Sequence, residues 1–184
     1  MNILNHLTNI GCLFNSLYAV LAILICFCYF KKYDLIYSLI IVSTTSALLN
    51  AVLKAFFKAP LMPHLGPGYA FPSGHAQLGM VLWGWLCIHH LLKKQTAFII
   101  FIIAGFSMFY QNYHTPIEII AGYITGLLVL ILFHRANLFK YPEWLIIINC
   151  CLMINILQQA YVFYFYILYF VIALLFLFYR LLRL

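Results

Sequence analysis

The chain has 184 residues, of which 67% are hydrophobic and only 7% are charged, and its mean hydropathy is +1.06. Soluble domains contain about 45–50% apolar and about 25% charged residues, so this composition excludes a soluble fold, a disordered chain and a coiled coil. It predicts an all-α integral membrane protein, a polytopic helical bundle that occupies residues 1–184 as one domain.

Positive charge is concentrated in short loops, which is typical of membrane topology and not of a nucleic-acid surface. The net charge of +7 arises from ten Lys and Arg against three acids. Six of these cations fall in the segments 31–34, 93–95 and 134–144. Because Lys and Arg mark cytoplasmic loops, we expect these segments in the cytoplasm and no nucleic acid partner. The opposite loops would face the periplasm or exterior of a bacterial inner membrane.

Five apolar stretches are long enough to cross a membrane as helices, at 10–30, 35–57, 75–92, 96–113 and 116–133. Each is close to the roughly 20 residues that a hydrocarbon core about 30 Å thick requires. A further region, 145–179, carries no charge, and it is long for one helix and short for two. The sequence therefore predicts a bundle of six or seven transmembrane helices.

Two polar segments lie on the side opposite the basic loops. The first ends in Pro-Ser-Gly-His at 72–75, at the start of the third predicted span. Ser73 is a suitable N-cap there, and the unpaired first amides of a helix attract anions such as phosphate. Gly74 would let a ligand approach the backbone, and Lys54 would add positive charge. His75 lies in the first turn, where it can give or take a proton.

The second polar segment precedes the fifth predicted span. Thr115 is expected to cap this helix, with Glu118 at its third position. From there the Glu118 carboxylate can reach back to one ring nitrogen of His114. Such a bond fixes the tautomer and leaves the other nitrogen free as a nucleophile or base.

Simpler interpretations exist for each of these residues. Glu118 could be only the acid of a capping box, and Lys54 could only extend from the helix end to the membrane interface. A metal site built from His75, His114 and Glu118 is another alternative. No ligand motif such as HExxH is present, so we expect neither a metal nor another cofactor.

The order of these residues resembles the type 2 phosphatidic acid phosphatase family, membrane enzymes that share their site with vanadium haloperoxidases. The resemblance covers roughly residues 50–126, the expected catalytic core, and it rests on Lys54, Pro-Ser-Gly-His at 72–75, Ser107, His114, Glu118 and Gly122.

The resemblance implies a role for each matching position. His114 matches the nucleophile that forms a phosphohistidine, and His75 matches the general acid that protonates the departing oxygen. Glu118 stands where the family usually has Asp, and it would orient His114. The phosphate would be held by Lys54 and by the backbone amides of Ser73 and Gly74.

Two positions depart from the family pattern. The family has Arg where this chain has Leu61 and Met108, so both phosphate-binding arginines are absent. Lys58 or His64 would substitute for them only in part, because neither offers the two-pronged hydrogen bonding of a guanidinium. The loss would weaken binding of a phosphomonoester dianion more than that of a singly charged phosphodiester, which favours a diester or a transfer reaction.

The sequence thus predicts a membrane enzyme that cleaves or transfers the phosphate of a lipid-linked phosphate. The alternative is a non-catalytic membrane protein that binds lipid phosphate, or a partner, at a degenerate family site. Neither the identity of the lipid nor the oligomeric state follows from the sequence.

Overall fold

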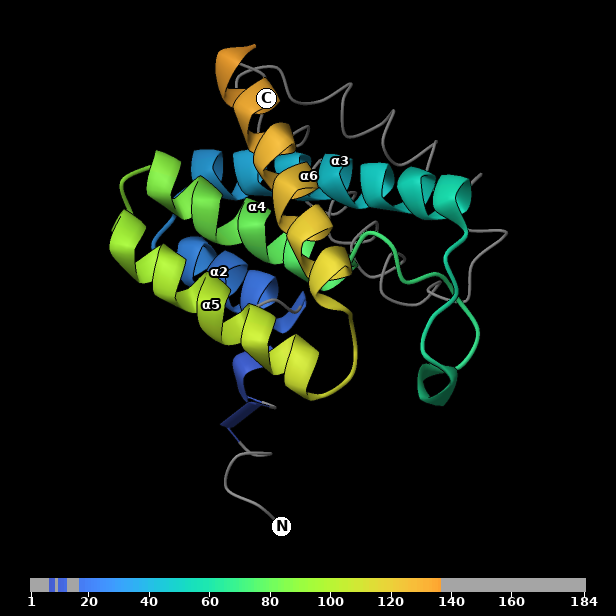
Figure 1. Ribbon diagram of the computed structural model, residues 1–184. Helices are drawn as coiled ribbons and strands as arrows, with labels where there is room; N and C mark the ends of the chain where they lie inside the picture. The colour runs from blue at the N-terminus through green and yellow to red at the C-terminus, as the bar shows by residue number, and fades with distance from the viewer. Residues whose placement is uncertain (1–6, 9, 13–16, 137–184) are drawn as a thin grey trace.

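The computed structural model describes residues 7, 8, 10–12 and 17–136, and this part of the chain is helical (Figure 1). In chain order its helices are α2 (Leu17–Tyr29), α3 (Tyr33–Phe57), the short 3-10 helix η1 (Pro63–Leu65), α4 (Gly74–Ile88), α5 (Lys94–Tyr110) and α6 (Pro116–Arg135). Each α-helix lies within or close to one of the predicted apolar stretches, which confirms the helical class. The region 145–179 is outside the described residues, so the number of spans stays a prediction.

Two of the helices, α3 and α6, are long and apolar enough to cross a membrane, with 25 and 20 residues. The spans predicted at 75–92 and 96–113 extend beyond the observed ends of α4 at Ile88 and of α5 at Tyr110. The observed helices α4 and α5 have only 15 and 17 residues.

The early end of α4 has a local cause in the backbone. His90 adopts a left-handed conformation with φ of 58°, and the Leu91 N–H donates to the Leu86 carbonyl at 2.9 Å. This arrangement closes a helix even where apolar residues continue, so hydropathy alone does not show the end. A similar turn, with Asn112 at φ of 54°, ends α5.

One apolar core joins α2, α3, α4 and α6. Trp85 of α4 is completely buried in this core. The centroid of the Trp85 ring lies 5.9 Å from the centroid of the Phe27 ring. Around it are buried aliphatic side chains, among them Leu39, Ile40, Leu82, Val129 and Leu130. This core fixes how α4 lies between α3 and α6.

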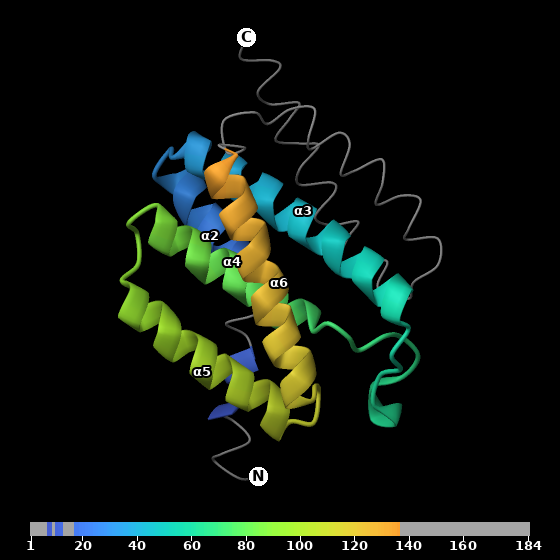
Figure 2. The same cartoon turned by 45° about the horizontal axis from the view of Figure 1, so that its top comes forward.

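The backbones of α4 and α6 approach closely at two glycines. A Cβ atom at Gly122 would lie 2.5 Å from the Ser73 carbonyl oxygen, and one at Gly126 would lie 2.7 Å from the Gln77 carbonyl oxygen. Small residues four positions apart allow this kind of helix contact in apolar surroundings. Figure 2 shows α6 crossing α4. As a result, the first turns of both helices lie side by side.

Residues 58–73 form a narrow hairpin between α3 and α4. The Leu61 N–H donates to the Gly68 carbonyl at 3.1 Å, and η1 lies at the tip. The hairpin and the turn between α5 and α6 lie toward one end of α4, and the connection from α4 to α5 lies at the other (Figure 1). This matches the expected pairing of the loops, while their assignment to the two sides of a membrane stays a prediction.

The close approach of α4 and α6 predicts that a single methyl group disrupts the bundle. Gly122→Ala should lower stability by about 1–3 kcal/mol, because the new Cβ would meet backbone, which cannot rotate away. Thermal unfolding in detergent measures this change. Ile124→Ala, at a side chain that is 54% exposed on the same helix, is the control. A Gly122→Ala melting temperature equal to that of wild type would contradict the proposed packing.

Candidate active site

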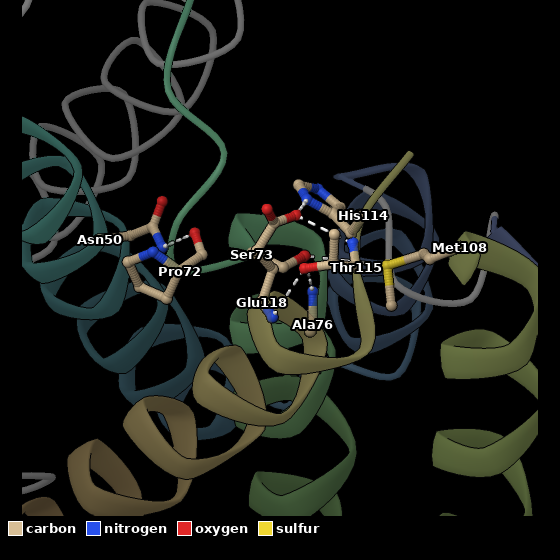
Figure 3. Close-up of polar contacts among 8 residues, drawn as sticks. All are labelled: Asn50, Pro72, Ser73, Ala76, Met108, His114, Thr115 and Glu118. Atoms are coloured by element: carbon tan, nitrogen blue, oxygen red, sulfur yellow. Dashed lines mark hydrogen bonds and ion pairs between the residues drawn. The ribbon is translucent and has the colours of Figure 1, made fainter. Parts of the chain in front are cut away.

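The start of α6 places a carboxylate against a histidine (Figure 3). Thr115 caps the helix, and its hydroxyl accepts a hydrogen bond from the Glu118 N–H at 3.4 Å. In return, Glu118 Oε2 accepts from the Thr115 N–H at 3.0 Å. The same oxygen lies 3.0 Å from His114 Nδ1. The capping box and the contact with His114 therefore coexist, since one oxygen makes both.

This contact sets the chemical state of His114. A carboxylate at Nδ1 favours the tautomer with its proton there, which leaves a lone pair on Nε2. The side chain is only 6% exposed, and this burial lowers the pKa of the His114 imidazole. The hydrogen bond and charge of Glu118 oppose the shift without cancelling it. His114 is thus neutral near pH 7, the state that a nucleophile requires.

The two histidines expected to act together do lie together. His75 is exposed in the first turn of α4, and its ring centroid is 6.2 Å from that of His114. The rings are inclined by 53°. A phosphoryl group between them would be within reach of both imidazoles.

Ser73 caps α4 as predicted, and it also joins three helices. Its hydroxyl oxygen accepts from the Ala76 N–H at 3.3 Å and lies 3.9 Å from Met108 Sδ. Its own N–H donates to the backbone carbonyl of Glu118 at 3.0 Å. The Ser73 amide is therefore engaged within the protein. The amides with no acceptor in their own helix are those of Gly74 and His75, one position further along than expected.

Lys54 contributes positive charge to this cluster and Lys58 does not. Lys54 is half-buried in the last turn of α3, where it interacts electrostatically with Glu118 and with both histidines. Lys58 ends that helix, exposed, with φ of 50°. Within the described residues it forms no ion pair. His64 is exposed in η1 at the hairpin tip.

Apolar side chains occupy the two positions where the resemblance described above led us to expect arginine. Met108 is 1% exposed and packs against Ala76 and Ile119. Leu61 lies against Gly68 inside the hairpin. Neither position supplies charge to the cluster.

No group of three or more His, Cys, Asp or Glu in the described part of the chain is arranged to hold a metal ion. His75, His114 and Glu118, the residues of the alternative metal site, do not form such a group. Gln77 was not among the predicted site residues, and its side chain is buried beneath the cluster. A glutamine one turn after Ser73 in an otherwise apolar helix was the available signal.

The pKa of His114 provides a test of the Glu118 contact. Glu118→Gln removes the charge that raises this pKa and leaves burial and Lys54, which both lower it. We therefore expect His114 to titrate at a lower pH in the variant, as measured by NMR of labelled imidazole nitrogens. Asp34→Asn, at an exposed site in the first turn of α3, should leave the titration unchanged. An equal or higher pKa in Glu118→Gln would contradict the observed contact.

Comparison with known proteins gives both a family and a fold. The sequence model of the PAP2 superfamily matches residues 31–142, more than half of the chain. The fold is similar to that in the crystal structure of LpxE from Aquifex aeolicus, with a TM-score of 0.60 and 21% sequence identity. The match covers 73% of this chain and 87% of that one. A comparison with curated proteins gives no match. The matched residues include Lys54, His75, His114 and Glu118, and the chain belongs to the PAP2 superfamily.

Proposed function

We propose that this protein is a membrane enzyme that cleaves or transfers the phosphate group of a lipid-linked phosphate through a phosphohistidine. The observation that carries the proposal is the hydrogen bond between His114 Nδ1 and Glu118 Oε2, at 3.0 Å, with His75 beside it. Membership of the PAP2 superfamily supports a phosphatase-type reaction.

In the first step, His114 Nε2 attacks phosphorus, and the bond from phosphorus to the leaving oxygen breaks. His75, protonated when the negative phosphate of the substrate lies beside it, donates its proton to that oxygen, so that a neutral alcohol departs. In the second step, neutral His75 takes a proton from water or from a second hydroxyl group. The oxygen of that group attacks phosphorus, and the phosphorus–nitrogen bond to His114 breaks. Water gives a phosphatase, and a lipid or sugar hydroxyl gives a transferase.

Charge that develops on the phosphoryl oxygens requires fixed positive partners. Lys54 and the free amides of Gly74 and His75 are in position to serve, at the positive end of the α4 dipole. Lys58 is exposed nearby and would contact a substrate only at the edge of the site.

A lipid substrate and a membrane location fit the rest of the fold. The helices α3 and α6 are long and apolar enough to span a bilayer, and Lys54 lies at one end of α3. A head group at the membrane surface would reach the site there. From the distribution of basic loops we place this end on the periplasmic or outer face of a bacterial inner membrane.

The second candidate is a binding protein without turnover, which the apolar residues Leu61 and Met108 favour. With Lys54 as the cation of the cluster, a singly charged phosphodiester is a better electrostatic match than a dianion. If the protein is an enzyme, this balance favours a diester or a transfer reaction.

Incubation of the purified protein with phosphomonoester, diphosphate and diester lipids, followed by mass spectrometry of the lipids, separates these possibilities. His114→Ala should lower turnover by several orders of magnitude, because it removes the nucleophile. His134→Ala, an exposed histidine in the last turn of α6, is the matched control. Free phosphate would identify a hydrolase, and a head group on a second lipid a transferase. A panel that both proteins leave unchanged would favour the binding protein.

Removal of the Lys54 charge should have a larger effect than removal of the Lys58 charge. A charge-assisted hydrogen bond contributes about 1.5–3 kcal/mol, so Lys54→Met should lower kcat/KM by about tenfold to about 150-fold. Lys58→Met, at an exposed position, should change it by less than about threefold. Equal effects of the two substitutions would show that Lys54 is not the phosphate ligand.

A further inference from the structure

Buried polar side chains form a connected network directly beneath the amide end of α4. Ser46 and Asn50 come from α3 and Gln77 from α4, and each is at most 2% exposed. Thr125 of α6 completes the set. Polar groups in such surroundings are costly unless each finds a partner, so the network has a specific geometry.

Gln77 is the centre of this network, and both the nitrogen and the oxygen of its side-chain amide have polar partners. Its Nε2 donates to the Ser46 carbonyl at 2.7 Å and to the Ser46 hydroxyl at 2.9 Å. Its Oε1 accepts from Asn50 Nδ2 at 2.9 Å and lies 3.0 Å from the Thr125 hydroxyl. That hydroxyl also lies 2.9 Å from the Ala121 carbonyl and 3.0 Å from the Gly122 carbonyl of its own helix. One side chain thereby connects three helices.

The orientation of the Gln77 and Asn50 side-chain amides follows from the backbone carbonyls of Ser46 and Pro72, which can only accept hydrogen bonds. The Ser46 carbonyl requires the NH₂ group of Gln77, so Gln77 must present its oxygen to Asn50. Asn50 must then present its own NH₂ group, which also donates to the Pro72 carbonyl at 3.2 Å. Reversal of either amide would bring two oxygen atoms together.

This chain of hydrogen bonds ends at the turn that carries His75. The Pro72 carbonyl is held by Asn50, and the next amide, the Ser73 N–H, is held by the Glu118 carbonyl (Figure 3). Both polar groups of the Pro72–Ser73 peptide are therefore held, the carbonyl from α3 and the N–H from α6.

Asn50 Oδ1 marks how closely the network approaches the site. This atom is buried without a hydrogen-bond partner among the described residues. A Cβ atom at Gly74 would lie only 3.0 Å from it. The absence of a side chain at Gly74 thus allows Asn50 to sit against the turn.

We propose that Gln77, with Asn50, is a positioning residue that holds His75 in register with His114. The inference rests on the proposed function, because it assigns the network a role in that reaction. Apolar side chains of similar size could fill the same space, but they would not fix the direction of the Pro72 carbonyl. Since an error of about 1 Å in the placement of reacting groups can lower a rate about a hundredfold, that direction matters for turnover.

The sharpest variant is Gln77→Glu, which keeps the shape of the side chain. A protonated carboxyl group can still donate to the Ser46 carbonyl and accept from Asn50. An ionised one would place negative charge against that carbonyl and displace the turn. We expect kcat close to that of wild type at low pH and a reversible fall of about tenfold or more as the pH rises, with the protein still folded by thermal unfolding.

The pH profile must be compared with that of wild type, because in the described part of the chain the titratable groups of the candidate site lie next to this network. They are His75 on α4, His114 in the preceding turn, Glu118 on α6 and Lys54 on α3. They are present in both proteins, so the ratio of the two kcat values isolates the new carboxyl group. Gln95→Glu, at an exposed position in the first turn of α5, is the control and should give a constant ratio.

A milder pair of variants covers the case in which Gln77→Glu fails to fold. Thr125→Val removes one partner of Gln77 Oε1 at nearly constant volume, and Thr125→Ser restores it. We expect kcat to fall about threefold to tenfold in the first and to recover in the second, at unchanged melting temperature.

A kcat ratio for Gln77→Glu that does not vary with pH would overturn the proposal. So would Thr125→Val with wild-type kcat if Gln77→Glu does not fold. If wild type itself turns over none of the phosphomonoester, diphosphate and diester lipids, the proposed function fails. The network can then be judged by NMR alone, since an unchanged His75 spectrum in Thr125→Val would also reject the positioning role.

Discussion

The close contact between α4 and α6 is the constraint on which the candidate site depends. Because Gly122 and Gly126 have no side chains, the two backbones meet, and the Ser73 N–H reaches the Glu118 carbonyl at 3.0 Å. Each histidine is carried at or just before the start of one of these helices, and the contact brings their ring centroids to 6.2 Å. The distance between the two imidazoles therefore depends on how α4 and α6 pack in an apolar core.

The carboxylate oxygen that caps α6 also orients His114, which lies just before this helix. Glu118 Oε2 accepts from the Thr115 N–H and contacts His114 Nδ1, both at 3.0 Å. A capping box is a local structure made by residues within one helical turn, so the Glu118 carboxylate is held in place by Thr115 without a distant partner. The candidate nucleophile is thus oriented by the element that ends its own loop, while His75 depends on distant partners in α3 and α6.

Local sequence patterns predicted the two helix caps at the site, those of α4 and α6. The contacts between residues far apart in the chain could not be predicted in this way. Thr-Pro-Ile-Glu at 115–118 specifies a capping box within four residues, and Ser73 as a cap follows in the same way. By contrast, the hydrogen bond from the Ser73 N–H to the Glu118 carbonyl joins residues far apart in the chain. The backbone amides expected to hold phosphate, those of Ser73 and Gly74, were therefore predicted one residue too early. The Gln77 network likewise depends on how three helices pack. Helix lengths were overestimated where a left-handed turn at His90 ends an apolar stretch.

The central claim is that His114 Nε2 bonds to phosphorus during turnover. The most direct measurement mixes the protein with a lipid phosphate that it consumes, denatures it in alkali within the first turnover, and locates the phosphoryl group by peptide mass spectrometry. We expect a phosphoryl group on His114 that appears and decays at rates compatible with turnover. Turnover with no modified His114 at any time, or with the phosphoryl group on another residue, would contradict it.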